Sequence, residues 1–127
     1  MRKTFAGLAV LLVVVVVAQF FLAASGAFSD APKDEAFKAH LALGYAVFFL
    51  PLLTALVGGL AKLPGRLIGM VALVAGLDSV QVGIAELARV IGDGTTAGRL
   101  FFGLHAVNGL AILAVAATVA RRAVKPD

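Results

Sequence analysis

Long apolar runs separated by short polar connections dominate the chain. Four such runs cover about residues 5–24, 36–61, 66–91 and 98–120, and each is close to the ~20 residues that a helix needs to cross the hydrocarbon core of a bilayer. The first run is longer than the ~7–15-residue apolar core of a signal peptide, so we assign it as a spanning helix. The pattern predicts an all-α fold, a four-helix transmembrane bundle that runs up-down-up-down as a single integral membrane domain over residues 1–127.

The composition leaves no segment for a separate soluble domain. Hydrophobic residues make up 61% of the chain and charged residues only 14%. Any function must therefore lie between the helices or at their ends, with the lipid bilayer as the first partner. The absence of cysteine excludes disulfides, thiolate catalysis and iron–sulfur ligation.

Basic residues gather on one side of the predicted bundle, the side that also holds both chain ends. The connections on the other side mix basic and acidic residues. Because cytoplasmic connections carry an excess of Lys and Arg, we expect both termini in the cytoplasm. The net charge of +4 then reflects topology, and no nucleic-acid partner is needed to explain it. The basic side comprises Arg2, Lys3, Lys62, Arg66, Arg121, Arg122 and Lys125.

The two histidines of the chain stand in matching contexts. Residues 37–44, "FKAHLALG", and residues 102–109, "FGLHAVNG", both have the form F-x-x-H-x-x-x-G. The second and fourth predicted helices run in the same direction, so His40 and His105 are expected at one level, about 6 to 10 Å below the outer boundary of the bilayer.

Glycine and phenylalanine flank each histidine at helical spacing. Gly44 and Gly109 follow their histidines by four positions, on the same helix face and one turn further in. Two bare patches would allow a flat porphyrin to lie close to the backbone. Phe37 and Phe102, one turn further out, would cover the ring.

The physical interpretation is a b-type haem held between two helices. His40 and His105 would ligate one iron from opposite faces as neutral imidazoles, giving a single bis-histidine haem. Propionate groups must reach water or a cation, and Lys38, Arg89 and Arg99 lie toward the outer side to pair with them.

Two glutamines and a glutamate complete the predicted cofactor site. Gln19 precedes His40 by 21 residues and Gln81 precedes His105 by 24, which suggests a duplicated helical hairpin. Gln19 and Glu86 are candidates to accept the Nδ1 proton of an axial imidazole and so orient it. Ion pairing of Glu86 with an arginine three residues on is the simpler interpretation of that residue.

Asp78 falls near mid-bilayer, ~20 Å from the outer end of its helix. No Lys or Arg is expected at that depth, so the carboxyl is expected to be protonated or hydrogen-bonded to Ser79, Gln81 or Asn108. Two interpretations stay open. Asp78 and Asn108 form a proton relay coupled to haem reduction or quinol oxidation, or they only hold the helices together.

With these segments the chain resembles the transmembrane four-helix b-type cytochromes, small haem proteins that exchange electrons with quinols or other carriers. Through "HAVNG" it is also similar to a family of small, functionally uncharacterised four-helix bacterial membrane proteins. The likeness covers most of the chain in helix count and topology. It implies an electron-transfer protein rather than a classical enzyme, in a bacterial cytoplasmic membrane, with quinol or a redox protein as partner. Di-haem members carry four ligating histidines, so this chain departs from them.

Other functions stay open on the same residues. Both histidines could serve only helix packing. A scaffold or accessory subunit without a cofactor would use a glycine-rich face of the third helix to dock on a larger complex or to form a homo-oligomer. A paired-histidine metal site would need Glu86 as a further ligand. A small transporter or proton channel would use Asp78 and Asn108. The glycine-rich face holds Gly69, Ala72, Gly76 and Gly83.

Overall fold

The computed structural model describes residues 1–92 and 94–125 and contains helices throughout. Their order is α1 (Arg2–Ala27), α2 (Lys33–Ala36), α3 (Lys38–Leu60), α4 (Gly65–Ile91) and α5 (Thr96–Val124). Four of them, α1, α3, α4 and α5, are long and apolar enough to cross a membrane. The prediction of an all-α chain with four such helices is confirmed. Each long helix lies within a few residues of its predicted bounds, the normal uncertainty at frayed ends.

One predicted helix begins differently from the expectation. The run predicted from residue 36 is preceded by the single turn of α2 and starts as α3 only at Lys38. Pro32 lies directly before α2, and the acidic Asp34 and Glu35 lie in its first turn, where the helix dipole favours them. Phe37 separates the two helices because its backbone leaves the regular helical geometry.

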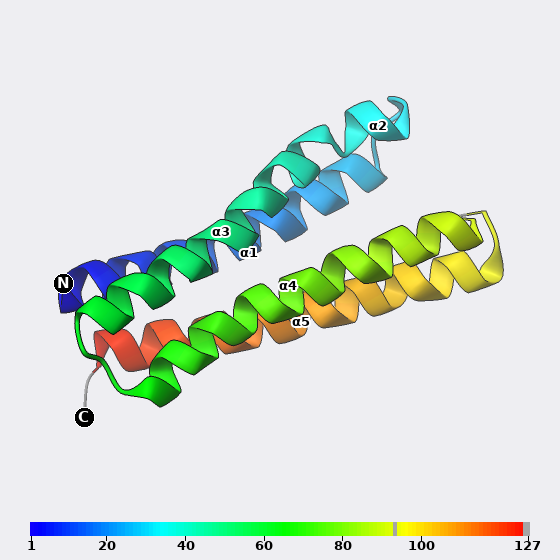
Figure 1. The fold of residues 1–127 in the computed structure, drawn as a ribbon. Helices are drawn as coiled ribbons and strands as arrows, with labels where there is room; N and C mark the ends of the chain where they lie inside the picture. Colours follow the sequence, from blue (N-terminus) through cyan, green and yellow to red (C-terminus); the bar gives the residue numbers. More distant parts are fainter. Residues whose placement is uncertain (93, 126–127) are drawn as a thin grey trace.

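The long helices form two hairpins that lie side by side. We call α1 with α3 the first hairpin and α4 with α5 the second hairpin. Figure 1 shows the start of α1, the α3–α4 turn and the end of α5 at one end of the molecule, where the hairpins meet. Toward the other end, which carries α2 and the α4–α5 turn, the two hairpins diverge (Figure 1).

Two apolar clusters fill the space between the hairpins. The first contains residues of all four long helices, including Leu12, Val47, Val74 and Ile112. The second lies nearer the chain ends and centres on Phe5, which is 1% exposed. In water, burial of apolar surface stabilises such a cluster by about 25 cal/mol per Å². In lipid this hydrophobic contribution is missing between helices, and close van der Waals packing stabilises their association instead.

The buried positions of the second hairpin repeat those of the first. Along α1 and α4 the offset is constant at 62 positions, so that Ala9, Leu12, Val16 and Gly26 correspond to Val71, Val74, Asp78 and Ala88. Along α3 and α5 the offset is 65, so that Val47, Pro51 and Thr54 correspond to Ile112, Ala116 and Val119. The same offsets relate the two glutamines and the two histidines. This agreement supports the duplicated hairpin suggested by the histidine segments.

Candidate functional site

Both histidines are held by the same hydrogen bond. The Nδ1 atom of His40 lies 3.1 Å from the main-chain carbonyl oxygen of Gln19, and the Nδ1 atom of His105 lies 3.1 Å from that of Gln81. A carbonyl oxygen only accepts, so each Nδ1 carries the proton and donates it. In the neutral ring this leaves the Nε2 lone pair free to bind a metal.

The two imidazoles lie next to each other across the bundle. Their ring centroids are 6.3 Å apart, and the ring planes are inclined by 60°. A metal–imidazole bond is about 2 Å long and the ring centre lies about 1 Å beyond the nitrogen, so one metal between two imidazoles separates the ring centres by about 6 Å. His40 and His105 therefore have the separation of a two-imidazole metal site. Within residues 1–92 and 94–125, no group of three or more metal-ligating side chains occurs, which does not favour the alternative with Glu86 as a further ligand.

A cavity of about 830 Å³ adjoins the two imidazoles and is lined by all four long helices. This volume lies within the ~300–1,000 Å³ typical of small-molecule and cofactor sites. Most of the lining is apolar. The predicted site residues among its lining are Gln19, His40, Gly44, Asp78, Gln81, Glu86, Arg89, His105 and Gly109.

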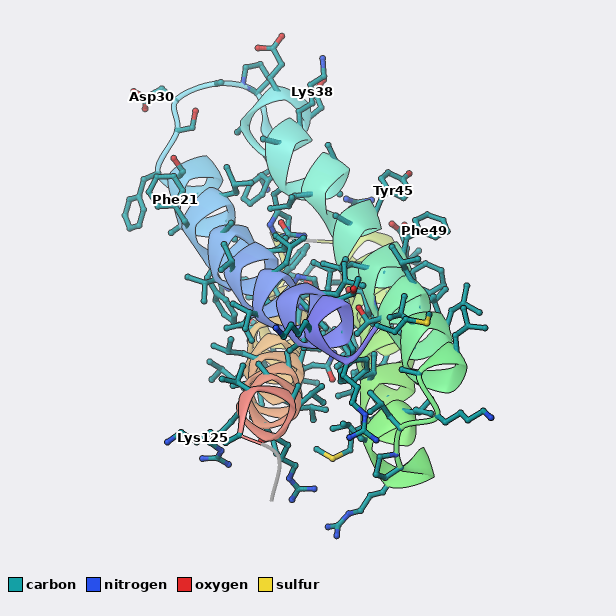
Figure 2. All side chains as sticks on the ribbon, turned by 90° about the vertical axis from the view of Figure 1, so that its left-hand side faces the viewer. Phe21, Asp30, Lys38, Tyr45, Phe49 and Lys125 are labelled. Carbon is teal, nitrogen blue, oxygen red and sulfur yellow. The ribbon has the colours of Figure 1, made fainter. Side chains whose placement is uncertain are left out.

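The cavity opens between α3 and α4. Its exposed lining residues come mainly from these two helices, including Tyr45, Phe49 and Val82. Figure 2 shows the rings of Tyr45 and Phe49 projecting outward from α3. In a bilayer this side would give a lipid-dissolved molecule direct access to the site.

The aromatic residues of the two segments lie differently. Phe37 contacts His40 edge to face, with ring centroids 6.1 Å apart. Phe102 is 37% exposed and is not part of the cavity lining. In the described part of the chain, no ring contact joins Phe102 to either histidine.

The two predicted bare patches are occupied by side chains of α1. A Cβ atom at Gly44 would lie 3.4 Å from Nε2 of Gln19, and one at Gly109 would lie 3.1 Å from Cζ of Phe20. The two glycines therefore leave room for side chains of α1 and also line the cavity. From the sequence, only a porphyrin was expected to fill the space beside them. Phe20 was missed, because nothing in the sequence shows which residue packs against a glycine of another helix.

The glutamines orient the imidazoles through their main chains rather than their side chains. The side chain of Gln81 instead accepts a hydrogen bond, since Asn108 Nδ2 donates to its Oε1 atom at 2.6 Å and to the Leu77 carbonyl at 2.9 Å. The Oε1 atom of Gln19 is buried and has no donor among the described residues. Leu43 stands at the position that corresponds to Asn108, which explains the difference.

Charged candidates are divided between the cavity and the surface. Glu86 and Arg89 line the cavity and form an ion pair with a 2.7 Å contact, both side chains being more than half exposed. Glu86 is thus engaged by Arg89, and the imidazole protons go to carbonyl oxygens instead. Lys38 and Arg99 are exposed outside the cavity lining, and Arg99 donates to Thr96 at 3.3 Å.

Asp78 lines the cavity but is not joined to the predicted relay. It is 7% exposed. The expected hydrogen bonds to Ser79, Gln81 and Asn108 are absent in the described structure, because Ser79 donates to the carbonyl of its own helix at Ala75 and Asn108 donates elsewhere. The structure therefore places Asp78 and Asn108 in one region without a direct link.

Comparison with known proteins identifies the family of the chain. A model described as "Family of unknown function (DUF6220)" matches residues 19–89, more than half of the chain. The chain belongs to this family, in agreement with its similarity to uncharacterised membrane proteins. It matches none of the curated proteins and none of the solved structures with which it was compared.

Proposed function

We propose that this member of a family of unknown function is a membrane cytochrome that binds one b-type haem through His40 and His105 and takes part in electron transfer. The observation that carries the proposal is the pair of imidazoles, 6.3 Å apart, each held by the same hydrogen bond to a main-chain carbonyl. Metal-ligating histidines commonly donate their other ring N–H to such a group, which fixes the ring and raises its basicity.

The surroundings of the pair fit a large, flat and mostly apolar group. The cavity beside the imidazoles is about 830 Å³ and predominantly apolar. A bound haem would supply a reversible one-electron carrier. Among the described residues, Arg89 is the one Lys or Arg side chain that lines the cavity, so we assign it, rather than Lys38 or Arg99, to the propionates.

Charge supports an orientation in the bilayer. Basic residues occur at the start of α1, in the α3–α4 turn and at the end of α5, three segments that lie at the same end of the molecule (Figure 1). We place this end in the cytoplasm, so that the bundle runs up-down-up-down with both termini inside. The histidines then lie near the extracytoplasmic side. Most of a hydrocarbon core of ~30 Å lies between them and the cytoplasm, so electron exchange is proposed on the outer side, with quinol or a redox protein.

Optical spectroscopy of the purified protein tests the proposal. The chain is expressed with haem supply, and reduced-minus-oxidised spectra are recorded for wild type, His40→Ala and His105→Ala. We expect a Soret band in wild type and its loss or shift in each variant. Val107→Ala is the matched control, since Val107 is exposed on α5 two residues from His105. A well-folded wild type without a Soret band overturns the proposal, and so do two alanine variants that keep the wild-type spectrum.

A second function is favoured by one observation on α4. A Cβ atom built at Gly69, Gly76 or Gly83 would meet nothing within 4 Å, so one face of this helix is thin and uncovered. Such faces pack closely against other helices in membranes. A colourless, folded protein would favour this alternative, an accessory or scaffold subunit without a cofactor.

A further inference from the structure

Asp78 is a buried carboxyl in an otherwise apolar layer of the bundle. It corresponds to Val16 of the first hairpin, which is 3% exposed and belongs to the apolar cluster with Val47, Val74 and Ile112. Unlike Val16, Asp78 has an ionisable side chain that borders the cavity shared with the histidines.

Helix packing does not require this carboxyl. The first hairpin has the same register of buried positions and fills the corresponding position with valine. In the described residues, Asp78 has no hydrogen bond and no ion pair that would compensate the loss of water around a carboxylate. An unpaired carboxylate in such a place is unfavourable unless it binds a proton or a positive charge arises nearby.

Among the residues that the structure describes, the charges around the cavity leave Asp78 without a counter-ion. Glu86 and Arg89 neutralise each other in their ion pair. The first helix contributes no titratable group to the lining. The titratable and charged groups that share the cavity with Asp78 are His40 and Tyr45 of α3, Glu86 and Arg89 of α4 and His105 of α5.

We propose that Asp78 is the redox-linked proton acceptor of this cavity, an inference that rests on the proposed haem function. When the site gains one electron from a one-electron donor, the Asp78 carboxylate takes up one proton from a hydronium ion of the surrounding water. One O–H bond forms on Asp78, one O–H bond of the hydronium ion breaks, and a water molecule is left. The proton balances the added negative charge, and no bond changes apart from these two. On oxidation the electron and the proton leave together.

Proton uptake on reduction determines the direction in which the midpoint potential changes with pH. Reduction favours the protonated carboxyl, so a lower proton concentration makes reduction harder and the midpoint potential falls as pH rises. For a one-electron couple, a tenfold change in proton concentration corresponds to about 59 mV, which is the largest slope per pH unit that one proton can produce.

Redox titrations over a series of pH values test this role, with dithionite as the reductant. We expect wild type to show the falling potential and Asp78→Asn and Asp78→Val to show a flatter profile with the Soret band retained. Asp78→Val copies the residue of the first hairpin. Glu35→Gln is the control, because Glu35 is an exposed carboxylate on α2 outside the cavity lining. A wild-type slope in both Asp78 variants overturns the proton role and leaves the haem proposal standing, whereas a wild type without haem overturns both.

If neither Asp78 variant folds, infrared spectroscopy of the wild type tests whether Asp78 takes up a proton on reduction. The difference spectrum between reduced and oxidised wild type is recorded with ordinary and with carbon-13-labelled aspartate. Asp78 is the one aspartate in the four apolar runs of the sequence. A carboxylic acid band that appears on reduction and shifts with the label supports the inference, and the absence of such a band overturns it.

Discussion

Asn108 provides a contact that the first hairpin lacks, and its removal should have a measurable cost. In Asn108→Leu the second hairpin receives the residue of the corresponding position, Leu43. Two hydrogen bonds disappear, one to the Leu77 carbonyl at 2.9 Å and one to Oε1 of Gln81 at 2.6 Å. Hydrogen bonds between membrane helices contribute ~0.6 kcal/mol on average and at most ~1.7 kcal/mol. We therefore expect the free energy of unfolding to fall by about 1–3 kcal/mol.

The assay is reversible unfolding in mixed micelles with increasing dodecyl sulfate, followed by far-UV circular dichroism. The reverse substitution, Leu43→Asn, is the matched control. It offers a donor to the buried Oε1 atom of Gln19, which has none in the described structure, and should leave stability unchanged or increase it. In a double-mutant cycle, Asn108→Leu should cost less when Gln81 is already leucine. An Asn108→Leu variant as stable as wild type would refute this account of the second hairpin.

Three further substitutions have expected outcomes in the same unfolding assay. Gly44→Ala should stabilise α3 by ~0.5–1 kcal/mol. Gly109→Ala should stabilise α5 by less, or destabilise it, because its Cβ would lie 3.1 Å from Phe20. Equal effects of the two substitutions would contradict the difference in packing around the two glycines. Thr95→Ala should lower stability by ~0.5–2 kcal/mol, because the Thr95 hydroxyl accepts the N–H of the first turn of α5, and an unchanged midpoint would count against this cap. Asp78→Val should raise stability by ~1–3 kcal/mol by removing an unpaired buried polar group, and a loss would indicate a partner for the carboxyl.

The helices could be predicted because spanning a bilayer sets a length that apolar runs reveal directly. The sequence also predicted that His40 and His105 share a level, and the structure places their ring centroids 6.3 Å apart. The sequence could not show that the imidazoles donate to main-chain carbonyl oxygens. Every residue has a carbonyl group, so the residue type does not indicate which carbonyl accepts the hydrogen bond. The side chain against Gly109 was likewise hidden, since Phe20 comes from another helix whose rotation depends on packing.

The two hairpins share their buried framework and differ in two polar residues. Both supply an imidazole, a carbonyl partner for it and a glycine one turn further in, because the same offsets relate all three features. Only the second hairpin adds a carboxyl and a carboxamide at positions that are valine and leucine in the first. A pair of corresponding ligands thus lies in an asymmetric environment, because Asp78 and Asn108 both belong to the second hairpin. Since the first hairpin holds its helices together with valine at the position of Asp78, and Asn108 already serves as a hydrogen-bond donor between α5 and α4, Asp78 is the polar residue whose chemistry should first be sought.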